Sequence, residues 1–307
     1  MKSVFAAIDI GSNSTNLLIA NSAGETIERI VRSTRLGAGV TKTGLLGAES
    51  IERTVTCISD YATLIEKHQV TEIRVVATAA CRMASNTAEF FQQVKTASNF
   101  SPELISAEQE GELSFSGATT SFARSSSKQI LVIDIGGAST ELMLGADSLK
   151  TTVSLPFGAV TVSESELHRD PPRPEELTNA ISLVSDAVDD AVHMNPEFAG
   201  ADQIIGIAGT IVTVAAVELG LQQFDASKLH SMCLKREAVE DVFRTLATEP
   251  LIDRVFNPGL PRDRADIIVG GCCVLVAVMR RLQISELIVS QHNLLDGVIN
   301  SLREKNS

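Results

Sequence analysis

The sequence contains no tryptophan and a single tyrosine, Tyr61. Proteins that bind single-stranded nucleic acid without sequence preference stack the bases on aromatic side chains, and a net charge of −12 offers no general attraction to nucleic acid or to an anionic membrane. We therefore expect neither nucleic acid nor membrane among the partners. An anionic ligand would need a local group of basic residues, and the candidates are Arg32, Arg35, Lys42, Arg82, Arg262 and Arg264.

The sequence also has no apolar run long enough for a membrane span and no C-x-x-C pair. Its longest apolar run, 267–279, falls short of the roughly 20 residues that a spanning helix needs. The five cysteines include the adjacent pair Cys272 and Cys273, which lies inside that run and is typical of small core residues. We therefore predict a soluble, cytoplasmic protein in a reducing compartment.

One motif occurs twice. Residues 8–15 read IDIGSNST and residues 133–140 read IDIGGAST, so that Asp9 and Asp134 lie 125 positions apart. A chain of 307 residues with 44% hydrophobic residues is long enough for two domains. The repeat therefore predicts a duplicated α/β domain, in which two copies of one fold face each other across a cleft lined by a glycine turn from each.

The pattern of elements restarts after the polar stretch 124–129, which we take as the domain boundary. Apolar alternation and helical spacing give the following elements. We predict strands at 4–10, 16–20, 26–34, 73–77, 103–106, 130–135, 141–144, 149–156, 204–208 and 287–290, and helices at 48–69, 87–96, 107–123, from about 175, 209–220, 236–247, 265–282 and 294–303.

The repeated turns have the composition of a phosphate site. Glycine admits backbone conformations in which consecutive N–H groups form a nest for an anion, and an aspartate at the strand end can hold a hydrated Mg²⁺ beside the phosphate. A third glycine-rich segment opens a predicted helix, whose free N–H groups also suit a phosphate. The predicted phosphate-binding residues are Gly11, Ser12, Asn13, Ser14, Gly136, Gly137, Ala138, Ser139, Thr140, Gly209 and Thr210. The sequence has neither a P-loop motif nor a complete G-x-G-x-x-G after a strand.

The paired turns resemble those of the actin-like superfamily, and within it the sequence resembles the exopolyphosphatase/guanosine pentaphosphate phosphohydrolase (Ppx/GppA) family in its short, two-domain form. The matching segments follow the family order along nearly the whole chain: AAIDIGSNSTNLLIA, VVATAACRMA, ELISAEQEGELSF, LVIDIGGASTELMLG, SLPFGAV, GIAGTIVTVAA, RADIIVGG and VSQHNLLDGVI. The resemblance implies two actin-like (ribonuclease H-like) domains, residues 1–126 with about 294–307 and residues 127–293. Each would begin with a five-stranded mixed sheet, and the last helix would pack on the first domain.

The resemblance assigns a general base to Glu110 in the segment ISAEQEGE. The family pattern Ile-Ser-Gly-x-Glu-Glu-Ala is altered here, so that Glu108 and Glu112 are alternatives; on a helix these two share a face and Glu110 points elsewhere. Arg82 matches a family arginine near the phosphates, although a charge on a helix surface is the other interpretation. The family's Leu-Arg-Glu-Gly segment reads LLDG, with Asp296 in place of the glutamate.

The resemblance also implies Mg²⁺, or Mn²⁺, near Asp134 and Glu141, to which we add Asp9 of the first turn; Glu141 could equally lie on the surface. The predicted function is release of terminal orthophosphate from inorganic polyphosphate, with guanosine pentaphosphate as a second candidate substrate and a homodimer as a candidate assembly. The alternatives are a non-enzymatic sensor of (p)ppGpp or polyphosphate and a small-molecule kinase of the same superfold.

Overall fold

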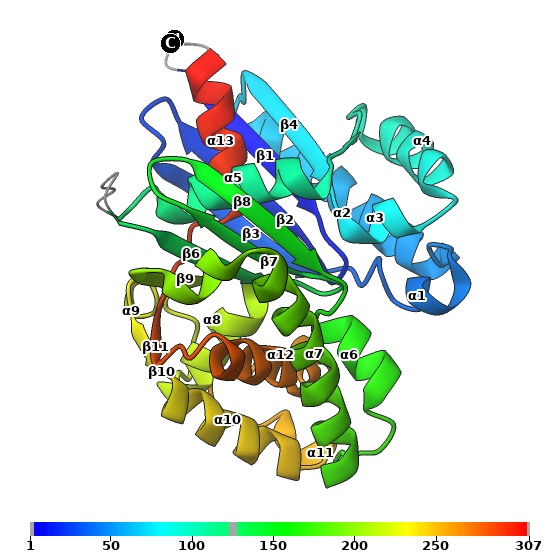
Figure 1. Cartoon of the computed structure of the whole chain (residues 1–307). Coiled ribbons are helices and arrows are strands. Elements are labelled where there is room, and N and C mark those ends of the chain that lie inside the picture. Colours follow the sequence, from blue (N-terminus) through cyan, green and yellow to red (C-terminus); the bar gives the residue numbers. More distant parts are fainter. Residues whose placement is uncertain (1–2, 123–127, 306–307) are drawn as a thin grey trace. The chain divides into compact units, whose positions relative to one another are not determined.

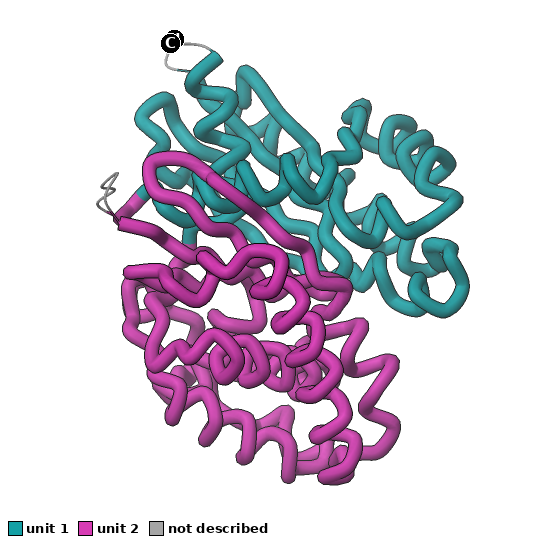
Figure 2. The backbone as a smooth tube through the Cα atoms, viewed as in Figure 1, with its two compact units in different colours: residues 1–120, 292–307 teal, residues 121–291 magenta. Residues whose placement is uncertain are grey.

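The structure, a computed structural model, describes residues 3–122 and 128–305. The chain divides into two compact units, which Figure 2 shows in different colours: unit 1, residues 1–120 with 292–307, and unit 2, residues 121–291. Most of the predicted boundary at 124–129 lies outside the described residues. None of the described helices is long and apolar enough to cross a membrane.

Unit 1 is built on a five-stranded mixed sheet with the strand order β3-β2-β1-β4-β5 (Figure 1). The first three strands are antiparallel, and β4 and β5 continue the sheet in parallel from β1. The strands are β1 Val4–Ile10, β2 Ser14–Asn21, β3 Thr26–Ser33, β4 Glu72–Ala77 and β5 Glu103–Leu104, and the helices are α1 Val40–Thr43, α2 Ala48–Lys67, α3 Ala79–Met83, α4 Thr87–Ser98, α5 Ala107–Thr119 and α13 Leu294–Lys305.

The two faces of this sheet are covered by different helices. Because side chains alternate along a strand, Ile8 and Ile10 of β1 point into the core beneath α2 and α4. Phe5 and Ala7 point to the opposite core, which includes Val298 of α13. Asp9 has the same parity as Phe5 and Ala7, so it lies on the sheet face that carries α13 and its neighbour α5.

Helices α5 and α13 touch through glycines. A Cβ atom on Gly117 would lie 2.0 Å from the carbonyl oxygen of Asn293, and one on Gly297 would lie 1.9 Å from that of Leu113. Only glycine permits such close backbones. Asp296, at the start of α13, accepts a hydrogen bond from Arg29 of β3 at 2.6 Å, so this aspartate has a structural role in unit 1.

Unit 2 has six strands in the order β10-β11-β9-β6-β7-β8. The prediction of five was wrong, because the three-residue strand β10 adds to the edge in antiparallel pairing with β11. The strands are β6 Ile130–Ile135, β7 Thr140–Gly145, β8 Leu149–Leu155, β9 Gln203–Ile207, β10 Cys233–Lys235 and β11 Glu286–Val289. The helices are α6 Ala159–Glu166, α7 Pro174–Met194, α8 Ala208–Glu218, α9 Ala226–Leu229, α10 Arg236–Thr248, α11 Leu251–Arg254 and α12 Ile268–Arg281, with 3-10 turns at Pro196–Gly200 and Arg262–Arg264.

The strand order confirms the predicted fold class. Counted from its first strand, unit 1 has the order 3-2-1-4-5, and unit 2 repeats it in β8-β7-β6-β9-β11. Both units are thus mixed α/β domains of the actin-like, ribonuclease H-like kind. That the two units face each other across a cleft stays a prediction.

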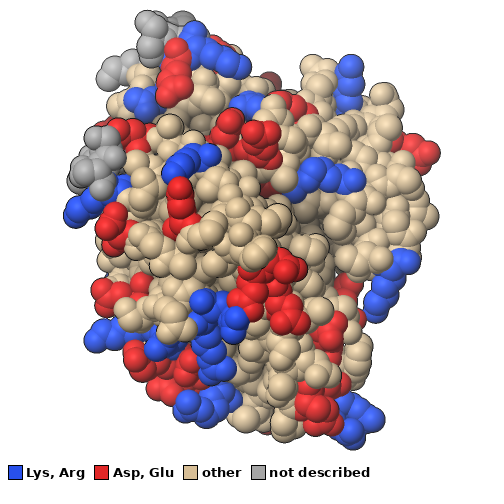
Figure 3. All heavy atoms as spheres, viewed as in Figure 1, with Lys and Arg blue, Asp and Glu red and all other residues tan. Residues whose placement is uncertain are grey.

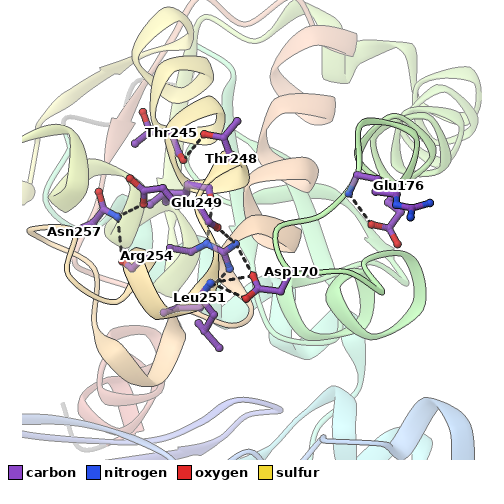
Figure 4. A network of polar contacts seen from close by, with 11 residues as sticks. Asp170, Glu176, Thr245, Thr248, Glu249, Leu251, Arg254 and Asn257 are labelled. Atoms are coloured by element: carbon purple, nitrogen blue, oxygen red, sulfur yellow. Dashed lines mark hydrogen bonds and ion pairs between the residues drawn. The ribbon is translucent and has the colours of Figure 1, made fainter.

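The core of unit 2 contains an apolar helix and an arginine. Helix α12 is buried from Ile268 to Met279, as expected for a helix that is apolar on every side, and the prediction that Cys272 and Cys273 are core residues is confirmed. Arg254, only 3% exposed, donates hydrogen bonds to the carbonyl oxygens of Leu246, Glu249 and Ala265 and to the carboxylate of Asp170 (Figure 4). This arginine therefore joins α10, α11 and the loop before α7.

Candidate active site

The turn between β1 and β2 directs its carbonyl oxygens into unit 1. The carbonyl oxygens of Ser12 and Asn13 accept hydrogen bonds from the backbone N–H groups of Thr34, Arg35 and Gly37 at 2.8–3.0 Å. Gly37 approaches the turn so closely that a Cβ atom there would lie 2.8 Å from Cβ of Ser12. The N–H groups of Ser12 and Asn13 have no acceptor among the residues that the structure describes.

The turn between β6 and β7 is built in the same way with a different support. The carbonyl oxygens of Gly136 and Gly137 accept hydrogen bonds from the N–H groups of residues 159–161, the first turn of α6, at 2.8–3.2 Å. Gly158 is needed for this contact, because a Cβ atom there would lie 2.5 Å from the carbonyl oxygen of Gly137. Within the described chain, no acceptor faces the N–H groups of residues 137–139.

Each turn therefore presents a set of free donors. Buried backbone N–H groups are nearly always hydrogen-bonded in folded proteins, and consecutive N–H groups without partners form an anion-binding nest. The turns 11–14 and 136–140 thus have the chemistry of a phosphate site, each within its own unit. Ser14 and Thr140 were placed in these turns from the sequence, and the structure assigns them to the first positions of β2 and β7.

The third glycine-rich segment, which contains Gly209 and Thr210, forms the start of helix α8. Ala208 has φ 68°, in the left-handed region that L residues seldom occupy, and such strain is found mostly at functional sites. Gly209 faces Arg264, whose Nη1 would lie 2.0 Å from a Cβ atom, and Thr210 is buried behind it. Burial lowers the pKa of Arg264. This segment therefore brings one guanidinium to the start of a helix.

Two carboxylates lie side by side in the sheet of unit 2. Asp134 on β6 and Glu141 on β7 are directly opposite in register, a placement that brings their Cβ atoms to about 5 Å. Ser154 on β8 donates a hydrogen bond to Glu141 at 2.8 Å. Because Glu141 is only 3% exposed, the alternative that it lies on the surface is wrong.

The matching pair in unit 1 has one carboxylate instead of two. Asp9 on β1 lies opposite Asn16 on β2, whose amide donates to Oδ2 of Asp9 at 3.0 Å. Oδ1 is buried without a hydrogen-bond partner in the described part of the chain. Burial, and then the charge of Glu110, raise the pKa of Asp9 to about 7, and the bond from Asn16 acts in the opposite direction.

Glu110 occupies the buried side of α5. Ser106 caps this helix through the N–H group of Gln109 at 3.1 Å, and the Gln109 side chain accepts from the N–H group of Ser106 at 3.0 Å. Gln109 therefore completes a capping box, which gives it a structural role at a position where the sequence departs from the family pattern. Helical geometry then leaves Glu108 and Glu112 exposed and Glu110 only 9% exposed.

Arg82 contacts Glu110 directly. Its Nη1 donates to Oε2 of Glu110 at 2.7 Å and to the carbonyl oxygen of Ile105 at 3.1 Å. Burial raises the pKa of Glu110, whereas the Arg82 charge and hydrogen bond act to lower it. The contact shows that Arg82 is more than a charge on a helix surface.

Sheet topology brings this pair to the first turn. β1 and β4 run parallel, with Ile10 opposite Ala77, so their carboxyl ends meet at one edge of the sheet. The N–H group of Thr78 donates to the carbonyl oxygen of Ile10 at 3.3 Å, and α3, which carries Arg82, begins one residue later. Unit 1 therefore places a free-donor turn, an arginine and a buried glutamate at the same end of the sheet.

The residues present suit a hydrated divalent cation. No group of three or more acidic, histidine or cysteine side chains that could enclose a metal occurs in residues 3–122 and 128–305. Mg²⁺ is commonly held by one or two carboxylates and keeps several waters. The pair Asp134 and Glu141 meets that requirement in unit 2, and the buried, unpartnered Oδ1 of Asp9 offers one further oxygen in unit 1.

Most of the candidate cations already have contacts of their own. Arg32 pairs with Asp60 at 2.6 Å and lies over the Tyr61 ring, and Arg262 lies over Phe256. On the face that Figure 3 shows, acidic and basic side chains are interspersed. The local basic patch that the sequence suggested stays a prediction.

The supports of the two turns were missed from the sequence. The sequence analysis assigned no supporting role to residues 34–37, and it did not predict α6. Ser106 and Gln109 match the capping-box pattern S-x-x-Q, a signal that could have located the start of α5. No comparable sequence pattern indicates the hydrogen bond that Asn16 donates to Asp9.

Comparison with known proteins gives a consistent picture. Residues 17–306 match the family model described as the Ppx/GppA phosphatase family. The sequence is 34% identical to exopolyphosphatase 2 of Mycobacterium tuberculosis over 97% of this chain and 98% of that protein. Among solved structures, a Ppx/GppA family member of Aquifex aeolicus has a TM-score of 0.82 and 30% identity, covering 100% of this chain and 99% of that one. An exopolyphosphatase-like protein has a TM-score of 0.92 and 29% identity, covering 99% and 100%.

Proposed function

The chain belongs to the Ppx/GppA phosphatase family, and from this we propose that it is an exopolyphosphatase that releases the terminal orthophosphate of inorganic polyphosphate. One observation carries the proposal. A buried glutamate, Glu110, lies at the same sheet edge as a turn with free N–H donors. The first group suits a general base and the second a phosphate anion.

In the proposed reaction the backbone N–H groups of the turns bind phosphate oxygens, and Glu110 accepts a proton from a water molecule. The water oxygen forms a bond to the terminal phosphorus, and the bond from that phosphorus to the bridging oxygen breaks. Orthophosphate leaves, and the shortened chain keeps the bridging oxygen. The protein's contribution is mainly positioning and electrostatic stabilisation, as in other phosphoryl transfers.

Asp134 and Glu141 would hold Mg²⁺ or Mn²⁺ in unit 2, and Asp9 offers a further carboxylate oxygen within unit 1. When bound, the ion supplies positive charge against the negative charge that develops on the phosphate oxygens. Every other part of the proposed reaction rests on the chain's own donors and on Glu110.

The alternatives differ from this proposal in the use of Glu110. A sensor of (p)ppGpp or polyphosphate needs the turns but no base, and a kinase needs an acceptor hydroxyl beside the base. The burial of Glu110 favours hydrolysis over sensing, because a binding protein gains nothing from a buried carboxylate near an anion site. Guanosine pentaphosphate is proposed as a second substrate of the same site.

Phosphate release tests the proposal. Linear polyphosphates of defined length, guanosine pentaphosphate and ATP would each be incubated with the protein, with and without Mg²⁺ or Mn²⁺. We expect cation-dependent release from polyphosphate. Glu110→Gln should lower kcat by about 10²–10⁴-fold, whereas the exposed controls Glu108→Gln and Glu112→Gln should each lower it less than about tenfold. Binding of these ligands by a wild type that releases no phosphate would establish the sensor instead.

A further inference from the structure

The contact between Arg82 and Glu110 presents a chemical conflict. A carboxylate in contact with a guanidinium is a poor base, because the positive charge stabilises its ionised form. The exposed fractions of the two side chains are 23% and 12%, so the pair is largely shielded from solvent. If Glu110 is to accept a proton from water, the pair must loosen before the chemical step.

Arg82 has the means to exchange partners. Nη1 alone makes the two hydrogen bonds, to Glu110 and to Ile105, and Nε and Nη2 have no acceptor within residues 3–122 and 128–305. Guanidinium groups bind phosphate through two parallel hydrogen bonds, which are stronger than bonds to neutral acceptors. A terminal phosphate on the 11–14 turn would therefore compete with Glu110 for Arg82.

We propose that Arg82 is a substrate-displaced latch: it holds Glu110 in the resting protein and moves onto the terminal phosphate when substrate binds, which releases Glu110 to act as the base. The latch rests on the proposed function, since it needs both a phosphate on the turn and a base at Glu110. It makes the base available only when a phosphate is in place. Glu110 is then a competitor of the substrate in the resting state.

A double-mutant cycle on substrate affinity tests the latch. The Kd of tripolyphosphate would be measured by titration calorimetry in EDTA, so that no turnover occurs, for wild type, Glu110→Gln, Arg82→Gln and the double variant. We expect Glu110→Gln to tighten binding roughly 3- to 30-fold, because it removes the competing carboxylate from a partly buried ion pair. In the Arg82→Gln background the same change should alter Kd less than about twofold.

The matched controls are Glu108→Gln and Glu112→Gln, which make the same change in net charge on the exposed side of α5 and should alter Kd less than about twofold. Equal tightening by Glu110→Gln in both backgrounds would mean simple charge repulsion and would overturn the latch. An unchanged or weakened affinity of Glu110→Gln would mean that the ion pair persists in the complex, and would overturn it too. Failure of wild type to bind tripolyphosphate would overturn the proposed function, and the latch with it.

Discussion

The two turns of this protein share a backbone design and differ in the side chains beside it. In both, carbonyl oxygens of the turn are held from within the unit, and the N–H groups of residues 12–13 and 137–139 have no acceptor in the described chain. In unit 1 the strand-end aspartate Asp9 faces an amide, Asn16, whereas in unit 2 Asp134 faces a second carboxylate, Glu141. The two units thus share the backbone design of the turn and differ at the position that faces the strand-end aspartate.

That difference separates two kinds of chemistry. Two carboxylates side by side repel each other unless a cation lies near them, so unit 2 is suited to a divalent ion. Unit 1 has a single strand-end carboxylate that receives a hydrogen bond, and it carries Glu110 and Arg82 at the same sheet edge. We therefore propose that proton transfer belongs to unit 1 and cation binding to unit 2.

The largest effect that we predict is a change in kcat, and it should differ between variants of the two strand-end aspartates. Asp134→Asn should lower kcat on the order of 10³-fold and abolish the response to Mg²⁺, because a metal ion contributes several kcal/mol to charge stabilisation. Asp9→Asn should lower kcat only about tenfold and keep the Mg²⁺ response. Phosphate-release rates across a Mg²⁺ titration measure both. Equal losses in the two variants would contradict the division of chemistry between the units.

The second prediction concerns a variant in which the carboxylate pair of unit 2 becomes a carboxylate beside an amide, as in unit 1. Glu141→Gln leaves one carboxylate beside an amide and keeps an oxygen able to accept from Ser154. The Mg²⁺ concentration for half-maximal activity should rise roughly 10–100-fold, the range typical of weakened metal sites, while kcat at saturating Mg²⁺ changes less. The control is Asn16→Gln, at the matching position of unit 1, which should leave that concentration nearly unchanged.

The third prediction compares how much one arginine of each unit contributes to the free energy of unfolding. Arg254→Met in unit 2 should lower the free energy of unfolding by about 3–5 kcal/mol, because it strands three carbonyl oxygens that the arginine satisfies within the core. Arg29→Met in unit 1 should cost less, about 1–2 kcal/mol, since Arg29 donates to the carboxylate of Asp296 and its loss strands no core carbonyl oxygen. Urea denaturation followed by circular dichroism measures both. If Arg254→Met lowered the free energy of unfolding no more than Arg29→Met does, the network in Figure 4 would contribute little beyond a single ion pair.

The fourth prediction concerns pH. The folded pKa of Asp9, about 7, lies above the ordinary value of 3.8, so the folded state binds the proton more tightly. Its contribution to stability is complete below pH 3.8 and is lost as pH rises through 7. Wild type should therefore lose stability relative to Asp9→Asn between pH 4 and 7, by less than about 1.4 kcal/mol per pH unit.

This loss can be followed in unit 1 alone. With no tryptophan in the sequence and Tyr61 the single tyrosine, buried in unit 1, intrinsic fluorescence reports on that unit. The measurement belongs in EDTA, so that cation binding does not change the titration of Asp9. A stability difference between wild type and Asp9→Asn that does not vary with pH would contradict the assigned pKa.

Local patterns were enough to predict the repeated turns. Glycine after Asp9 and Asp134, and apolar alternation before them, are written in a few consecutive residues. Helical periodicity placed Glu108 and Glu112 on one face and Glu110 on another, and the family resemblance assigned the base to Glu110. The supports could not be predicted, because residues 34–37 and the start of α6 become partners of the turns only through folding. The contacts of Arg82 with the Glu110 carboxylate and the carbonyl oxygen of Ile105 also depend on tertiary structure.

The glycine contact between α5 and α13 has a consequence for protein synthesis. Unit 2 is one continuous stretch, residues 121–291, whereas the core of unit 1 that contains Phe5 also requires Val298. A ribosome therefore makes all of unit 2 before it delivers α13, the helix that packs against α5. Domains fold as units during translation, so the second half of the chain can fold before the first half is complete. The helix that carries Glu110 therefore gains its packing partner only after the whole of unit 2 has been made.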